Sequence, residues 1–89
     1  MAVEHGKDSI RVNAICPGTI RTEVWDPILR EQPDLLRQYA DLYPLGRVGN
    51  PDDVANCALF LASDEASWIT GAIITVDGGL TAGRSDFVL

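Results

Sequence analysis

The stretch IRVNAICPGTIRT, residues 10–22, decides the fold of this chain. Apolar and polar residues alternate through its first half, which predicts a β-strand. Pro17 has no N–H to donate and ends that strand, and Gly18 permits a change of direction that a β-carbon would resist. The apolar face of the strand is formed by Ile10, Val12, Ala14 and Cys16. Ligands bind beyond the carboxyl ends of strands in open α/β sheets, so we expect a binding site at residues 19–22.

A helix and a second strand follow farther along the chain. Asn50 is a helix cap, Pro51 suits the first helical position, and two aspartates fill the first turn, so a helix is predicted over residues 50–63. The apolar run 72–76 predicts a buried parallel strand, which the turn at 77–79 ends. Strand, helix and strand together predict a right-handed βαβ crossover and place the chain in the α/β class.

Residues 23–45 form an aromatic insert, interrupted by prolines, between the first strand and this helix. Asp26 and Pro27 predict a helix start, with aspartate as the cap, Pro33 interrupts the helix, and Pro44 ends it. Two interpretations stay open at this point. The insert is either a lid over a cleft or a plain pair of packed helices.

The composition limits the possible functions. The chain has 89 residues, 46% of them hydrophobic, and a formal net charge of −6, so one domain at most fits and a nucleic-acid or anionic membrane surface is disfavoured. Ordinary solubility also explains this acidity. Cys16 and Cys57 have apolar neighbours and are predicted to be small buried residues in a reducing compartment. No segment has transmembrane or signal-peptide character, and we expect a cytoplasmic location.

Two features that look chemical have plainer structural explanations. The only histidine, His5, falls in the last turn of a short helix that we expect Gly6 to end in the left-handed conformation. Asp52 and Asp53 are adjacent, so their carboxylates point in different directions and complement the helix dipole. We therefore predict no metal site.

Residues 11–22 resemble the Arg-Val-Asn-x-x-x-Pro-Gly-x-Ile/Val-x-Thr segment of the short-chain dehydrogenase/reductase family. Segments within residues 47–64 and 70–79 match the same family in order, so the resemblance covers nearly the whole chain. It corresponds to about the last third of a family member. The resemblance implies the C-terminal part of a doubly wound, Rossmann-like parallel sheet, arranged as strand, helical lid insert, helix and strand. Residues 1–89 would then belong to one NAD(P)-binding domain.

The resemblance also implies a function. The family transfers hydride between NAD or NADP and an alcohol or ketone, so we expect a small-molecule substrate and a nicotinamide cofactor. Ile20 would contact the carboxamide through its backbone and Thr22 through its hydroxyl, and residues 23–45 would cover the substrate. Helix 50–63 and strand 72–76 would lie at the interface of a homo-oligomer, a dimer or a tetramer. The cofactor-binding residues carried over are Pro17, Gly18, Thr19, Ile20 and Thr22.

The family's phosphate-binding glycines and its catalytic Ser, Tyr and Lys have no counterpart here, and we expect them upstream of Met1. Tyr43 and Arg47 have the spacing of the catalytic pair, but Pro44 and Gly46 break the helix that would align them. The glycine-rich stretch 79–85 lacks a following helix. No catalytic residue is therefore predicted in this chain, and the 89 residues alone are expected to be inactive.

Two other classes of function stay open. The chain could be a non-catalytic, truncated interaction module that pairs with full-length subunits through its strand edges. It could also be a ligand-binding α/β domain without redox chemistry.

Overall fold

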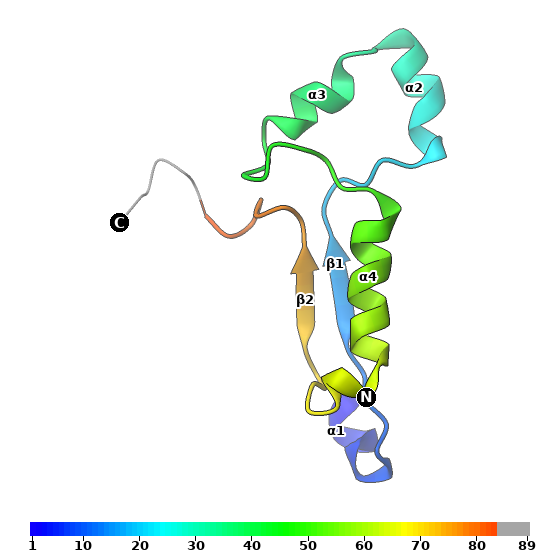
Figure 1. Cartoon of the computed structure of the whole chain (residues 1–89), viewed down its shortest axis with the longest axis vertical. Helices are drawn as coiled ribbons and strands as arrows, with labels where there is room; N and C mark the ends of the chain where they lie inside the picture. The colour runs from blue at the N-terminus through cyan, green and yellow to red at the C-terminus, as the bar shows by residue number, and fades with distance from the viewer. Residues whose placement is uncertain (84–89) are drawn as a thin grey trace.

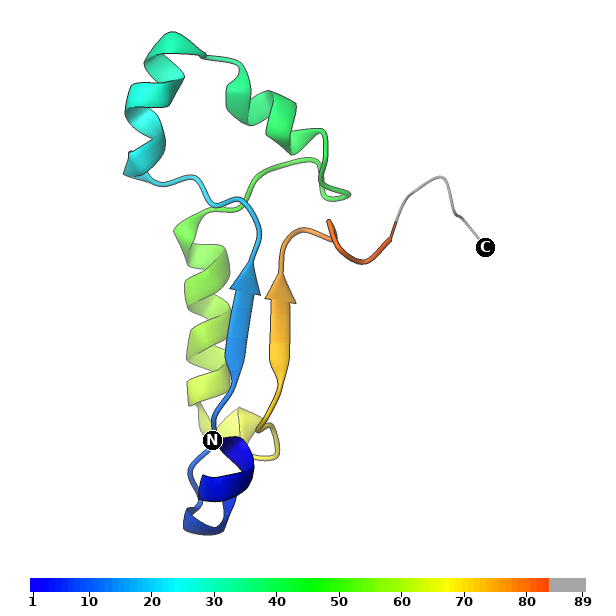
Figure 2. The same cartoon turned by 180° about the vertical axis from the view of Figure 1, so that it is seen from behind.

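The computed structural model describes residues 1–83; residues 84–89, with the end of the glycine-rich stretch, lie outside the described part (Figure 1). Strands β1 (Ala14–Pro17) and β2 (Ile73–Val76) pair in parallel, with Ala14 opposite Ile73. Helix α4 (Pro51–Ala62) runs alongside and contacts both strands, as Figures 1 and 2 show from opposite sides. The parallel β–α–β arrangement predicted from the sequence is confirmed.

β1 is shorter than predicted, because side chains share the hydrogen bonding of the residues before it with one backbone bond, from the Gly71 N–H to the Val12 carbonyl at 2.8 Å. The Val12 N–H donates to Thr70 Oγ1 at 3.0 Å. The Asn13 side-chain amide donates to the Ile69 carbonyl at 3.0 Å and accepts the Ala72 N–H at 3.0 Å. These bonds fix the entry into β1 against the segment that leads into β2.

Arg11 ties the same entry segment to the end of α4. Its guanidinium donates to the Leu61 carbonyl at 2.7 Å and to the Ser63 carbonyl at 3.1 Å. The last carbonyls of a helix have no partner within the helix, and a cation there also complements the helix dipole. Arg11 therefore joins the helix layer to the sheet.

The N-terminal segment differs from the prediction. Helix α1 (Ala2–His5) continues into a 3₁₀ turn, η1 (Gly6–Asp8), and Gly6 has right-handed helical angles, φ −58°. The left-handed residue is Ser9, at φ 61°, whose N–H donates to the Gly6 carbonyl. The prediction that Gly6 ends the helix in the left-handed conformation is wrong, because the chain makes one more turn before it reverses.

Few side chains are buried within the described part. The buried hydrophobic residues are Tyr43, Leu61 and Ala66. Cys16 is exposed, Cys57 is half-buried and Ile10 is 50% exposed, so the predicted burial of both cysteines and of the apolar face of the first strand is wrong for this chain. The prediction that strand 72–76 is buried is also wrong, since Ile73 on β2 is exposed. The physical reason is that residues 1–83 supply one helix layer, α4, for a sheet with two faces.

The insert extends beyond the carboxyl ends of both strands, as an arch over their arrowheads in Figure 1. It contains η2 (Glu23–Trp25), α2 (Asp26–Glu31) and α3 (Leu35–Ala40), and the predicted interruption near Pro33 is confirmed. Trp25 rather than Asp26 occupies the N-cap position of α2, because η2 runs directly into that helix. The rings of Trp25 and Tyr39 meet edge to face, 5.6 Å between centroids, and hold the two arms of the arch together.

The remaining helical element is η3 (Asp64–Ala66), a 3₁₀ turn after α4. Between residues 1 and 83, no helix combines the length and apolar character needed to cross a membrane.

Candidate functional site

The loop after β1, residues 18–22, is held in extended form by residue 49. The Gly49 N–H donates to the Thr19 carbonyl at 2.9 Å, and the Arg21 N–H donates to the Gly49 carbonyl at 2.8 Å. These two bonds form an isolated parallel bridge between Ile20 and Gly49. The backbone of the loop is thus fixed just beyond the sheet, where sequence analysis placed a binding site.

Gly18 is needed at the start of this loop because other atoms come close. A β-carbon there would lie 3.1 Å from both Cα and Cβ of Asp77 and 3.1 Å from Cε1 of Tyr43. The structure therefore attributes the glycine to close packing against β2 and the insert, and Gly18 is absent from the glycines with positive φ. A glycine is therefore required here for close packing and not for the change of direction that was predicted.

Tyr43 is a site residue that sequence analysis missed. Its side chain is buried, and its hydroxyl donates to Thr19 Oγ1 at 2.6 Å and accepts the Thr19 N–H at 2.8 Å. Arg47 binds a different partner, Asp53.

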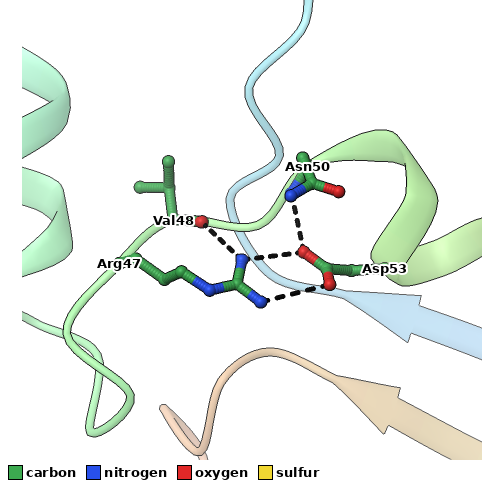
Figure 3. A network of polar contacts seen from close by, with 4 residues as sticks. All are labelled: Arg47, Val48, Asn50 and Asp53. Carbon is green, nitrogen blue, oxygen red and sulfur yellow. Dashed lines mark hydrogen bonds and ion pairs between the residues drawn. The ribbon is translucent and has the colours of Figure 1, made fainter.

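Arg47 and Asp53 form a bidentate ion pair at the start of α4 (Figure 3). Arg47 Nη1 and Nη2 donate to Asp53 Oδ2 and Oδ1 at 2.8 and 3.1 Å, and the Asn50 N–H donates to Asp53 Oδ2 at 2.8 Å. These bonds lower the pKa of Asp53 to about 2, with the Arg47 hydrogen bond as the largest cause. The cap at Asn50 and the structural role of Asp53 agree with the prediction.

Asp53 is expected to make stability depend on pH at the acid end. Its pKa is about 2 in the folded chain against an ordinary value of 3.8, so the unfolded state takes up a proton first. The stabilising contribution is therefore complete above pH 3.8 and is lost as the pH falls through about 2. Between these values, the melting temperature of the parent protein should fall more steeply than that of Asp53→Asn or Arg47→Gln. The same dependence of melting temperature on pH in all three proteins would contradict this assignment.

Three of the five predicted cofactor residues line one cavity at the carboxyl ends of the strands. Its volume is about 150 Å³, and it lies between the loop, the base of the insert and the turn after β2. The lining residues are Gly18, Thr19, Ile20, Tyr43, Leu45, Arg47, Gly49, Asp53, Val76, Asp77 and Gly78.

The other two predicted residues lie at the edges of this region. Pro17 is the last residue of β1, opposite Val76. Thr22 lines a shallow groove with Arg21, Val24 and Pro51. The Thr22 side chain does not cap η2, although Thr22 occupies its N-cap position. The structure therefore splits the predicted set between a cavity and an adjoining open groove.

Asp77 closes the turn after β2. Its carboxylate accepts the N–H groups of Gly79 and Thr81, each at 3.0 Å, and the Thr81 hydroxyl at 2.7 Å. The Thr81 hydrogen bond is the main cause that lowers the pKa of Asp77. The predicted turn is confirmed, and this carboxylate is engaged in it. Over residues 1–83, no group of three or more His, Cys, Asp and Glu residues is placed to hold a metal ion.

Comparison with known proteins identifies the class to which this fold and loop belong. The family model described as enoyl-(acyl carrier protein) reductase matches residues 1–81. Galactitol 2-dehydrogenase (L-tagatose-forming) from Cereibacter sphaeroides is 47% identical over 81 residues, 91% of this chain and 32% of that protein. The 3alpha-hydroxysteroid dehydrogenase of Mediterraneibacter gnavus is 49% identical over 78 residues, 88% of this chain and 30% of that protein. All three are oxidoreductases by name.

Solved structures define the family more closely. An oxidoreductase of the short-chain dehydrogenase/reductase family from Burkholderia thailandensis superposes with a TM-score of 0.86 and 51% identity, over 93% of this chain and 33% of that one. ElxO with NADP bound superposes with a TM-score of 0.84 and 30% identity, over 92% of this chain and 33% of that one. The chain belongs to the short-chain dehydrogenase/reductase family, with a partial Rossmann-like fold. It spans about a third of the length of the relatives that it matches.

Proposed function

We propose that the whole protein is an NAD(P)-dependent oxidoreductase that transfers hydride between the nicotinamide and an alcohol or ketone. Residues 17–22 of this chain hold the nicotinamide end of the cofactor. The observation that carries this assignment is the loop at the carboxyl ends of two parallel strands, which residue 49 fixes through its backbone. Relatives named as dehydrogenases of galactitol and of a hydroxysteroid, and a neighbour crystallised with NADP, support the activity and the cofactor.

The residues present fit the amide end of a nicotinamide. The Thr22 side chain makes no capping hydrogen bond to η2. Thr22 lines the groove beside the loop, where its hydroxyl can hydrogen-bond a carboxamide. The backbone of Ile20 is fixed by the bridge to Gly49, so it presents its groups without a further ordering cost. When bound, the nicotinamide supplies or accepts the hydride. This chain would fix which face of the ring meets the substrate.

The described residues fit a pyrophosphate poorly. The first turn of α4 carries Asp52 and Asp53, whose charges repel phosphate from the helix N-terminus. In the turn after β2, the Asp77 carboxylate already accepts the N–H groups of Gly79 and Thr81. We therefore propose that other segments of the whole protein hold the pyrophosphate and supply the proton donor for the hydride step.

Thr22→Val should weaken cofactor binding in the whole protein. The valine keeps the shape and removes the hydroxyl, and one hydrogen bond is worth about 1 kcal/mol, or about a fivefold rise in Kd for NADH or NADPH. Fluorescence titration of the reduced cofactor measures this change. ADP-ribose, which lacks the nicotinamide, should bind both proteins equally. Unchanged Kd and turnover for the reduced cofactor would refute the Thr22 contact.

The insert, residues 23–45, is proposed to cover the substrate. It arches beyond the ends of the strands, beside the loop, and the Trp25–Tyr39 contact gives it a fixed shape (Figure 1). Exchange of residues 23–45 for the matching segment of a relative should change the ranking of substrates by kcat/KM. Cofactor affinity should change less. A collapse of cofactor affinity with an unchanged ranking would show that the insert is purely structural.

We further propose that the whole protein is a cytoplasmic homo-oligomer with α4 and β2 at a subunit interface. Leu59 on α4 and Ile73 on β2 are 72% and 71% exposed, which leaves apolar surface to be covered. A monomer in sedimentation equilibrium would contradict the oligomer.

A further inference from the structure

Tyr43 connects the base of the insert to the loop after β1. Its side chain is only 6% exposed, and its hydroxyl makes two hydrogen bonds, both to Thr19. The phenol donates to Thr19 Oγ1 at 2.6 Å and accepts the Thr19 N–H at 2.8 Å. The N–H and the hydroxyl of Thr19 therefore share one hydrogen-bond partner, the Tyr43 hydroxyl, which belongs to the insert.

Thr19 is held from a second side as well. Its carbonyl accepts the Gly49 N–H at 2.9 Å, which aligns the loop with residue 49. This bond holds the peptide between Thr19 and Ile20, whereas the N–H of the peptide between Gly18 and Thr19 is bound by Tyr43. The phenol is thus the group that fixes the orientation of the peptide between Gly18 and Thr19.

The segment that carries Tyr43 is itself anchored. The Gly46 N–H donates to the Tyr43 carbonyl at 2.8 Å, and the Leu45 N–H donates to the Gly78 carbonyl at 3.1 Å. The Tyr43 ring lies against Gly18, where an added β-carbon would be 3.1 Å from Cε1. Ring packing and backbone bonds together hold the hydroxyl in place, as a preorganised site requires.

We propose that Tyr43 is a positioning residue for the nicotinamide end of the cofactor and acts through Thr19. The inference rests on the proposed function, because it takes residues 17–22 as the nicotinamide loop. Tyr43 lines the same cavity as Gly18 and Thr19, and the role proposed for its hydroxyl is exerted on Thr19. Its hydroxyl holds the peptide between Gly18 and Thr19 and the Thr19 side chain, and so sets how the loop that carries Ile20 and Thr22 approaches the carboxamide.

The test is Tyr43→Phe in the whole protein, which keeps the ring and removes the hydroxyl. Two hydrogen bonds to Thr19 are lost, so Kd for NADH and NADPH should rise about tenfold. The Kd for ADP-ribose should stay unchanged, because that fragment does not reach the loop. The matched control is Tyr39→Phe on α3, which lies 37% exposed against Trp25 and should leave both affinities unchanged.

A double variant adds a second readout. Thr19→Val removes the hydroxyl that accepts the hydrogen bond of the phenol. The fold-rise in Kd for NADH of Tyr43→Phe combined with Thr19→Val should therefore be smaller than the product of the two single fold-rises. Full additivity of the two effects would overturn the inference.

The remaining outcomes separate the inference from the function on which it rests. If Tyr43→Phe weakens the binding of NADH and of ADP-ribose equally, Tyr43 is a general packing residue and the inference is overturned. If Tyr43→Phe binds NADH as tightly as the parent protein while Thr22→Val binds it more weakly, the inference is overturned and the proposed function stands. A parent protein that binds neither NADH nor NADPH would overturn the proposed function itself.

Discussion

Residues 1–89, produced by themselves, are expected to show neither a cooperative melting transition nor measurable affinity for NADH. The described residues bury three hydrophobic side chains, Tyr43, Leu61 and Ala66, around a sheet of two strands. A domain is stable by only about 5–15 kcal/mol when its core is complete, so a core of this size cannot offset the loss of chain entropy. The N-terminus of α4, the one long helix among residues 1–83, also suits a pyrophosphate poorly, because Asp52 and Asp53 lie in its first turn.

Circular dichroism on heating and a fluorescence titration with NADH measure both parts of this expectation. The control is the whole protein under the same conditions, which should melt cooperatively and bind the cofactor. A soluble monomer of residues 1–89 that melts cooperatively and binds NADH with micromolar affinity would contradict the expectation. Cooperative melting without NADH binding would instead favour the truncated interaction module that sequence analysis left open.

Gly18→Ala should impair both the stability and the cofactor binding of the whole protein. The new β-carbon would meet Asp77 on one side and Tyr43 on another, each at 3.1 Å. Because Asp77 Cα is backbone, the relief must come from Tyr43 or from the loop, and either movement disturbs the hydrogen bonds of Tyr43 with Thr19. Overpacking of this kind costs about 1–3 kcal/mol of stability. We expect a lower melting temperature and weaker NADH binding together.

The matched control for this substitution is Gly6→Ala. A β-carbon at Gly6 meets nothing within 4 Å, and its φ of −58° is one that alanine adopts readily. Gly6→Ala should therefore leave both melting temperature and cofactor affinity unchanged. Equal effects at the two positions would show that neither follows from the contacts around Gly18.

Local features of the fold could be predicted from the sequence where a few adjacent residues determine them. The start of α4 at Asn50 and Pro51, the break near Pro33 and the turn at Asp77 follow from capping, ring geometry and short-range hydrogen bonds. The parallel pairing of the strands also follows, because a helix between two short apolar runs leaves little choice of topology.

Features that depend on distant partners were predicted less well. The side chains of Asn13 and Thr70 take part in the hydrogen bonding just before β1, and no local pattern in the sequence reveals these partners. The burial of Cys16 was wrongly predicted, because an alternating pattern shows which face is apolar and not whether a layer covers it. The Tyr43–Thr19 contact joins positions 24 residues apart, and spacing alone does not reveal it.

The most direct measurement for the proposed site is the response of the backbone amides of residues 18–22 in the whole protein to two ligands, by nuclear magnetic resonance. If the loop holds the nicotinamide end, NAD or NADP should shift the signals of Gly18, Thr19, Ile20 and Thr22, and ADP-ribose should leave them in place. Signals that do not respond to either dinucleotide, or that respond equally to ADP-ribose, would contradict the assignment of this loop.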